Sequence, residues 1–357
     1  MKVAVVHDML IDKGGGGRLM ATLARAFNAD IWTTQYVPEA TYPELKQFKV
    51  FSHPLKSFRI PPALKTYLKI PRTGLIETEA IFKFRRMDLS AYDLIITSGP
   101  WGRHIAVQEK NHPCIYYEPG VQEYHHLKGP AKIWVWYMMK LHAEAMQKLD
   151  VITANSEFTR SKIQKYYQRD SEVVFHGVDI KKYHFGPAED YFLSVQRISP
   201  DKRIETQLEA FRMVPEQKLL VVGSLHQGNM SYYRMLTGIA PPNTTFRLSI
   251  TDQELAGLYT HSKAVVQTNP DEAFGNVPVE AMASGKPCIA VNSGGFKETI
   301  VPDQTGILVD SPYPENLARA IRDFNSLDFD PEVCLERAKL FSEEMFVERM
   351  KKAISRL

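Results

Sequence analysis

Two glutamates, Glu272 and Glu280, lie eight positions apart in the segment NPDEAFGNVPVEAMASGKPCIAVNSGGFKE. A helix from Asn276 to Ser284 would place Glu272 on the preceding loop and Glu280 within the helix. The amides of its first turn would favour a diphosphate, because a helix N-terminus carries free N–H groups and partial positive charge. Each carboxylate could accept sugar hydroxyl protons through charge-assisted hydrogen bonds. The segment therefore indicates a site for a ligand with both phosphate and hydroxyl groups.

The spacing of Glu272 and Glu280 alone also fits a loop carboxylate and a solvated helix residue, because paired glutamates are common. The neighbours of Glu280 favour the binding interpretation, since an idle carboxylate among apolar side chains is costly. These apolar neighbours are Pro278, Val279, Ala281 and Met282.

Two cations lie on one predicted strand-to-helix loop in the segment SVQRISPDKRIETQLEAF. Arg197 ends the predicted strand and Lys202 opens the next helix. An arginine fork and a lysine point charge can together neutralise a departing diphosphate. Taken alone, the loop fits a solvated basic surface better than a ligand site.

Four consecutive glycines, Gly14, Gly15, Gly16 and Gly17, follow the first predicted strand. They predict a loop whose backbone can approach a phosphate, although a mobile surface turn would read the same way. Tyr117, in CIYYEPG, could hydrogen-bond or stack on a sugar, but it is a poor base at neutral pH and could also belong to the core. Because no Asp-x-Asp stands near a strand end, we expect no metal.

Short β-rich runs alternate with amphipathic segments, a pattern typical of parallel strands joined by helices. The runs lie at 3–10, 30–36, 92–99, 113–119 and 151–156, and again at 192–197, 219–224, 245–249, 264–269 and 287–292. We therefore expect an α/β protein of two doubly wound, Rossmann-like domains, 1–178 and 179–340, with ligands in a cleft between them. Residues 341–357 should form a helix that packs back on the first domain, and Ser156 should begin a helix.

Composition narrows the class of protein. The 357 residues are 44% hydrophobic and 24% charged, as in a globular enzyme, and the net charge of +3 is small for a nucleic-acid binder. Three scattered cysteines indicate a reducing compartment. Because the N-terminus begins directly with a strand pattern and shows no leader, we expect a cytoplasmic protein.

The stretch 56–86 carries a local excess of positive charge that only Glu77 and Glu79 oppose. Such an excess suits an anionic membrane surface or a phosphate-bearing acceptor, and a solvated surface loop is an equal alternative. Its cations are Lys56, Arg59, Lys65, Lys69, Arg72, Lys83, Arg85 and Arg86.

The glutamate segment resembles the Glu-x7-Glu signature of the family 4 retaining glycosyltransferases, which have the two-domain GT-B fold. The resemblance implies that Glu272 contacts the donor sugar and Glu280 the nucleotide ribose. It implies that Arg197 and Lys202 clamp the diphosphate and act in catalysis with Glu272, without a metal. It also implies donor contacts from the amides of Phe274, Gly275, Asn276 and Val277, and base recognition by the backbone of 247–251, which includes Ile250.

The first domain resembles the family more loosely. In the family the glycine-rich segment faces the donor phosphates or the acceptor, but this chain lacks the usual acidic residue near Gly17. Many relatives also have a histidine where Tyr117 stands. VHDML and ANSEFTRSKI are most similar to mannosyltransferases of the family.

These observations predict a retaining transferase that moves a hexose, with mannose favoured, from a GDP- or UDP-linked donor. The acceptor would be a glycan, a lipid-linked sugar or a phosphorylated molecule, and the enzyme could work at the cytoplasmic membrane face. The alternatives are a nucleotide-sugar epimerase or hydrolase of the same fold, and a silent subunit that binds a sugar nucleotide for a partner transferase.

Overall fold

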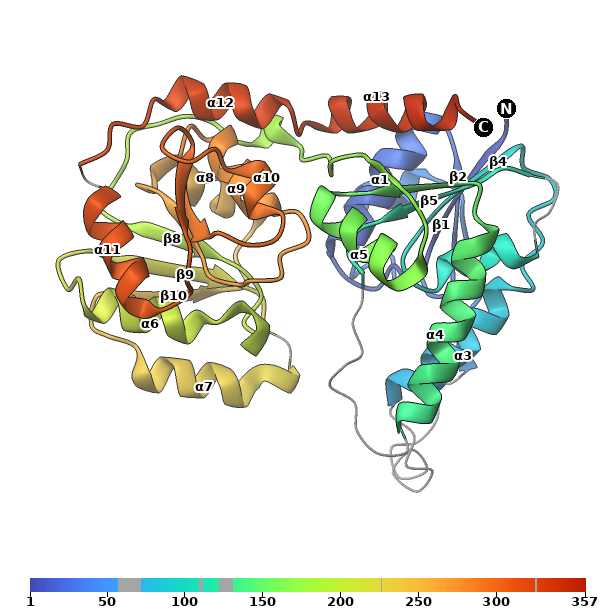
Figure 1. The fold of residues 1–357 in the computed structure, drawn as a ribbon, viewed down its shortest axis with the longest axis horizontal. Coiled ribbons are helices and arrows are strands. Elements are labelled where there is room, and N and C mark those ends of the chain that lie inside the picture. Colours follow the sequence, from blue (N-terminus) through green and yellow to red (C-terminus); the bar gives the residue numbers. More distant parts are fainter. Residues whose placement is uncertain (57–71, 109–111, 122–130, 226, 325) are drawn as a thin grey trace. The chain divides into compact units, whose positions relative to one another are not determined.

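The computed structural model describes residues 1–56, 72–108, 112–121, 131–225, 227–324 and 326–357. The chain divides into two compact units, each with its own parallel sheet. The first unit comprises residues 1–175 and 347–357, and the second comprises 176–346. Figure 1 traces both units along the chain, from the blue N-terminus to the red C-terminal helices.

The first unit contains a seven-stranded sheet in the order β3-β2-β1-β4-β5-β6-β7. Its strands are β1 Val3–His7, β2 Asp30–Thr33, β3 Val50–Ser52, β4 Leu94–Ser98, β5 Cys114–Glu118, β6 Val151–Ala154 and β7 Glu172–Val173. Its helices are α1 Gly15–Phe27, α3 Arg72–Phe84, α4 Ala131–Lys148 and α5 Glu157–Tyr167, with short 3-10 helices η1 Pro43–Gln47 and η3 Gly102–Val107.

The second unit contains a six-stranded sheet in the order β10-β9-β8-β11-β12-β13. Its strands are β8 Phe192–Val195, β9 Leu219–Gly223, β10 Thr244–Leu248, β11 Val265–Gln267, β12 Cys288–Val291 and β13 Gly306–Val309. Its helices are α6 Ile204–Arg212, α7 Met230–Ile239, α8 Asp252–His261, α9 Asn276–Ala283, α10 Phe296–Thr299, α11 Pro314–Phe324 and α12 Pro331–Lys339. The 3-10 helices are η4 Ile180–Lys182, η5 Pro200–Lys202 and η6 Gln227–Asn229, and α13 Glu343–Ile354 crosses into the first unit.

Both sheets are covered on two faces, as their buried strands require. In the first unit, Ala4 and Val6 of β1 share a core cluster with Met146 of α4 and Ile163 of α5. In the second unit, α6 and α11 pack against each other on one face, and α8 and α9 pack together on the other (Figure 1). The predicted helix start at Ser156 is confirmed, because its Oγ accepts a hydrogen bond from the Thr159 amide at 3.0 Å.

The order of strands identifies one point in each sheet, at the carboxyl ends of its central strands, as a place for ligands. In the first sheet the chain winds from β1 outward to β3 and then returns to β4 on the other side of β1. In the second sheet it winds from β8 to β10 and returns to β11 on the other side of β8. In open α/β sheets, ligands bind beyond the carboxyl ends of the strands where the order reverses in this way. Ligands are therefore expected beside the segments after β1 and β4 in the first sheet, and after β8 and β11 in the second.

The glycine run differs from the predicted loop. Gly15 to Gly17 form the first turn of α1, and Gly14 is its N-cap. Two aromatic side chains pack on this turn: a Cβ at Gly16 would lie 2.3 Å from His7 Nε2, and one at Gly17 would lie 3.1 Å from the Tyr42 ring. Gly16 and Gly17 therefore allow close packing of His7 and Tyr42 on the helix, whereas a side chain at Gly15 would meet open space.

Candidate functional site

The second unit brings a cation and a carboxylate together at the reversal of strand order. Lys202, in η5 after β8, places its Nζ 3.1 Å from Oε2 of Glu272, in the loop after β11. The side chains are 17% and 25% exposed, so this ion pair is partly shielded from water. Asn269 donates its Nδ2–H to the same glutamate oxygen at 2.6 Å. Two predicted site residues thus meet, together with an amide that the sequence did not single out.

The loops that carry this pair are tied to each other by short contacts. Thr268 donates its hydroxyl hydrogen bonds to the carbonyls of Lys202 and Arg203, at 3.0 and 3.1 Å. On the other side, the Gly295 amide donates to the Glu272 carbonyl at 2.8 Å. A Cβ at Gly294, whose φ is +59°, would lie 2.4 Å from that carbonyl oxygen. The position of Glu272 therefore depends on a glycine at 294.

The start of α9 offers backbone amides close to Glu272 in sequence. The N-cap is Gly275, with φ of +98°, and no side chain caps the helix. The first-turn amides of a helix have no intrahelical acceptor, so the amides of Asn276 and Val277 are suited to an anionic ligand. Phe274, which precedes the N-cap, is buried, and its ring lies edge-on to that of Phe341 at 5.5 Å. The helix runs to Ala283, one residue short of the predicted end.

Glu280 lies inside α9. Its apolar neighbours in the sequence predicted that its carboxylate would be held by a partner. Tyr259 of α8, which is fully buried, donates its hydroxyl hydrogen bond to Glu280 Oε2 at 2.6 Å. Burial raises the pKa of the Tyr259 hydroxyl well above its ordinary value, and the neighbouring Glu280 carboxylate adds to the rise. The phenol therefore remains protonated and orients one glutamate oxygen.

Arg197 is not drawn into the Lys202–Glu272 pair. Its side chain is 59% exposed, and its guanidinium lies 3.7 Å from the Asp201 carboxylate. An exposed pair of this kind is worth little energy, so Arg197 is free to move toward a ligand. Its role in a diphosphate clamp stays a prediction.

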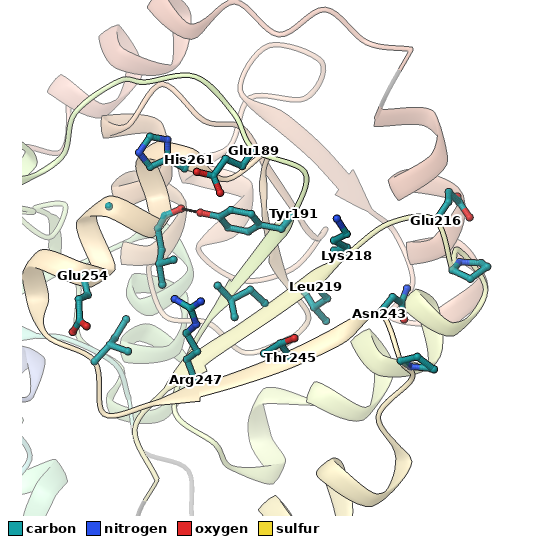
Figure 2. A pocket seen from close by; sticks show the side chains of 16 residues that line it. Glu189, Tyr191, Glu216, Lys218, Leu219, Asn243, Thr245, Arg247, Glu254 and His261 are labelled. Carbon is teal, nitrogen blue, oxygen red and sulfur yellow. Dashed lines mark hydrogen bonds between the residues drawn. The ribbon is translucent and has the colours of Figure 1, made fainter.

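Ile250 lines a groove on the second unit that is about 740 Å³ in volume. Figure 2 shows this groove from close by. Arg247 of β10 and Glu254 of α8 line the same groove. Across it, Tyr191 donates its hydroxyl hydrogen bond to the Leu258 carbonyl at 2.8 Å. Among the described residues, the lining includes neither Glu272 nor Lys202. Ile250 and the ion pair therefore do not line the same groove, and the role of Ile250 in base recognition stays a prediction.

In the first unit, Tyr117 is fully buried near the end of β5, and burial raises the pKa of its hydroxyl well above the ordinary value. Its location agrees with a core residue, the alternative that the sequence left open. Two cations of the stretch 56–86 are engaged locally: Lys83 donates to the Pro54 carbonyl at 2.7 Å, and Arg85 pairs with Glu144 at 2.6 Å.

Several other members of that stretch lie outside the described residues. They are Arg59, Lys65 and Lys69, together with the side chain of Arg72. Glu77, which the sequence counted as opposing charge, is instead buried and contacts His142 at 3.0 Å.

Within the described ranges, no group of three or more His, Cys, Asp or Glu is placed to hold a metal ion. Metal independence stays a prediction. No helix in the described part of the chain is long and apolar enough to cross a membrane.

Two family models match consecutive parts of the chain. Residues 13–182 match Glycosyltransferase Family 4, and residues 178–341 match Glycosyl transferases group 1. Together with the fold, these matches show that the chain belongs to the family 4 glycosyltransferases. The resemblance inferred from the glutamate segment is therefore confirmed.

Individual relatives are distant and match only part of their own length. D-inositol 3-phosphate glycosyltransferase of Segniliparus rotundus is 29% identical over 190 residues, 46% of this chain and 42% of the relative. Alpha-1,3/1,6-mannosyltransferase ALG2 of Saccharomyces cerevisiae is 26% identical over 201 residues, 42% of this chain and 40% of the relative. The chain thus spans about half of the length, or less, of the curated relatives it matches.

Solved structures share the whole fold. The superposition on HepE of Anabaena in complex with UDP covers 100% of both chains, with a TM-score of 0.78 and 19% identity. Sucrose-phosphate synthase of Thermosynechococcus elongatus covers 100% of this chain and 99% of its own, with a TM-score of 0.75 and 18% identity. The predicted fold class, two doubly wound α/β domains of the GT-B type, is confirmed.

Proposed function

We propose that this glycosyltransferase is a retaining hexosyltransferase that uses a nucleoside diphosphate sugar and needs no metal. The observation that carries the proposal is the Lys202–Glu272 pair beside the uncapped start of α9, at the reversal of strand order in the second sheet. A cation and free amides suit a diphosphate, and two restrained carboxylates, Glu272 and Glu280, suit hydroxyl groups of a sugar and a ribose.

In the proposed reaction, the acceptor hydroxyl oxygen attacks the anomeric carbon on the face from which the diphosphate departs. The bond between that carbon and the phosphate oxygen breaks, and the departing oxygen takes the hydroxyl proton. Lys202, Arg197 and the α9 amides stabilise the charge that develops on the phosphate, which is the largest contribution expected from such donors. No separate base is required, which suits the buried position of Tyr117.

The relatives support a nucleotide-sugar donor and one of the two candidate bases, uracil. HepE was crystallised with UDP and with UDP-glucose, and ALG2 is a mannosyltransferase. We therefore propose a GDP- or UDP-linked hexose, with mannose as the first sugar to test. The proposed acceptor is a glycan, a lipid-linked sugar or a phosphorylated molecule, as in the inositol phosphate enzymes.

The test is calorimetric binding of GDP, UDP, ADP and TDP, with and without magnesium, to the native chain and to Glu280→Ala. We expect one nucleotide to bind without metal and the substitution to weaken it by about tenfold or more, the worth of hydrogen bonds to a charged group. If no nucleotide binds, the proposal falls. Donor consumption without an acceptor would instead favour the epimerase or hydrolase, and binding without transfer would favour the silent subunit.

A cluster of exposed apolar side chains on α4 supports peripheral contact with an anionic membrane. Ile133 is 74% exposed, Trp136 is 58% exposed and Tyr137 is 45% exposed. Lys140 places its Nζ 3.8 Å from the centre of the Trp136 ring. Tryptophan and tyrosine favour the interface of a bilayer, and lysine suits its anionic headgroups.

Vesicle flotation tests this contact. We expect the native chain to float with vesicles that contain phosphatidylglycerol and a Trp136→Ser, Tyr137→Ser variant to stay in solution. Equal flotation of both proteins, or of neither, would contradict a role for the α4 cluster.

A further inference from the structure

The turn that carries Lys202 ends in a residue with an unfavourable backbone conformation. Arg203 has φ of +51° and ψ of +46°, a left-handed conformation that residues with a side chain rarely adopt. Such a conformation persists only where surrounding contacts hold it. The Lys202 amide donates to the Ser199 carbonyl at 3.0 Å, and the Arg203 amide donates to the Pro200 carbonyl at 3.2 Å. Both bonds lie within the turn, so they do not fix it against the rest of the second unit.

A threonine that follows another strand fixes this turn. Thr268 comes directly after β11, and its side chain is buried. Its hydroxyl oxygen lies 3.0 Å from the Lys202 carbonyl oxygen and 3.1 Å from that of Arg203. Because both carbonyls can only accept, the threonine proton is directed at them. One hydroxyl therefore holds the backbone of Lys202 and of the left-handed residue next to it.

A glutamine orients the threonine hydroxyl. Gln207 of α6 is fully buried, and its Nε2–H donates to Thr268 Oγ1 at 2.9 Å. The proton of Thr268 is already directed at carbonyls, so the hydroxyl can only accept from Gln207. The amide, the hydroxyl and the Lys202 carbonyl thus form one directed chain of hydrogen bonds, and the bonds of such a chain strengthen one another.

The other end of the Gln207 amide argues against a role in packing alone. Its Oε1 is enclosed and has no hydrogen-bond partner among the described residues. An enclosed acceptor of this kind destabilises a fold, so an apolar side chain of similar shape would serve packing better. The glutamine is therefore better explained by the bond that its Nε2 makes to Thr268.

The chain of hydrogen bonds ends beside the proposed diphosphate site. Lys202 Nζ lies 3.1 Å from Oε2 of Glu272, which is four residues after Thr268. A lysine ammonium is a point charge on a flexible stem, so its direction depends on how well the backbone below it is held. Charged groups that are already in place when charge develops on a ligand stabilise it most.

We propose that Thr268 and Gln207 are positioning residues, which hold the Lys202 ammonium against the phosphate nearest to the donor sugar. This inference rests on the proposed transferase function, in which Glu272 contacts the sugar and Lys202 the diphosphate. Because Lys202 lies beside Glu272, its charge acts on the β-phosphate more than on the α-phosphate. The affinity for a nucleoside diphosphate, divided by the affinity for the matching monophosphate, therefore reports the position of this cation.

The experiment measures this affinity ratio by isothermal titration of the full chain with GDP and GMP, and with UDP and UMP. Thr268→Val removes the hydroxyl and keeps the shape of the side chain, Thr268→Ser keeps the hydroxyl, and Gln207→Met removes the amide donor. The matched control is Thr153→Val, because Thr153 is also buried and donates to a backbone carbonyl, that of Tyr116 at 3.1 Å, in the first unit. Melting temperatures check that each variant folds.

We expect Thr268→Val to weaken the diphosphate by about tenfold and the monophosphate by less than about twofold, so that the affinity ratio falls. Thr268→Ser and Thr153→Val should keep the native ratio. Gln207→Met should lower the ratio by about threefold, because the threonine hydroxyl can still reach the carbonyls. In a Lys202→Met background, Thr268→Val should lower the ratio no further, since residues that act through one cation are not additive.

The inference is overturned if Thr268→Val keeps the native ratio, either because both affinities are unchanged or because both fall equally, as a purely structural role predicts. A further fall of the ratio in the Lys202→Met background would also contradict it. If Thr268→Val does not fold, Gln207→Met decides, and a native ratio in that variant overturns the inference. Native nucleotide binding with an unchanged ratio removes this inference alone, whereas absent nucleotide binding by the native chain removes the transferase function as well.

Discussion

Replacing Glu272 by Gln should separate the recognition of the diphosphate from the recognition of the sugar. In the free protein Glu272 holds the Lys202 ammonium at 3.1 Å, so a phosphate must compete with the carboxylate for that cation. At this separation, unit charges attract by about 5 kcal/mol in an effective dielectric of 20, although desolvation offsets most of it. We take about 1–2 kcal/mol as the net competition, which corresponds to about five- to thirtyfold in affinity.

Glu272→Gln should therefore raise the affinity for the nucleoside diphosphate by that factor and lower the affinity for the matching nucleotide sugar, which loses a carboxylate partner for its hydroxyls. Lys202→Met should weaken both ligands, by about ten- to a hundredfold, because the cation is lost. Isothermal titration with both ligands measures the ratio of the two dissociation constants directly.

Asp201→Asn is the matched control. Asp201 also pairs with a cation on this turn, but its partner Arg197 is 3.7 Å away and both side chains are 59% exposed. Such a pair contributes about 0–1 kcal/mol, so the ratio of the two dissociation constants should stay near the native one. If Glu272→Gln instead weakened both ligands equally, Glu272 would be needed to position Lys202, and the competition argument would be refuted.

Three further changes test other parts of the site and its support. Tyr259→Phe removes the donor 2.6 Å from Glu280 and should lower the free energy of unfolding by about 1–3 kcal/mol, with weaker nucleotide binding, as urea denaturation and calorimetry would reveal. Gly294→Ala should cost about 2 kcal/mol or more, because its Cβ would meet a carbonyl at 2.4 Å, whereas Gly257→Ala, in open space on α8, should gain about 0.5–1 kcal/mol in the same assay. Burial lowers the pKa of His142 from 6.5 to about 4. Between these two pH values the unfolded state binds more protons than the folded state, so the free energy of unfolding falls as the pH falls below 6.5. The melting temperature of His142→Gln should therefore fall less at acid pH than that of the native chain. Equal falls in the two melting temperatures would contradict this.

Local sequence patterns were sufficient to predict the strands and helices and much of the site in the second unit. The alternation of β-rich and amphipathic runs predicted two doubly wound sheets, and Ser156 predicted a helix start through its own hydroxyl. Glu272 on a loop and Glu280 in the following helix also lie as predicted, because each assignment depends on a few neighbours in sequence.

The prediction of a loop at Gly14 to Gly17, made from local sequence alone, was wrong. Glycine has low helix propensity, so Gly14 to Gly17 predicted a loop. In the structure Gly15 to Gly17 begin α1, and His7 and Tyr42 pack where side chains at Gly16 and Gly17 would otherwise stand. Packing with residues remote in sequence decided the outcome, and no local signal carries that information.

By itself the sequence determined which residue types are available for chemistry and which elements carry them, because helix and strand periodicity and capping act over a few residues. Only the tertiary structure decided which of them meet. Lys202 and Glu272 are 70 positions apart, and Gln207 and Thr268 are 61 apart. They come together because the second sheet reverses its strand order, which brings the ends of β8 and β11 side by side. That order follows from how the strands pack as a whole, so Asn269, Tyr259 and Gly294 became visible as partners of the site only in the folded chain.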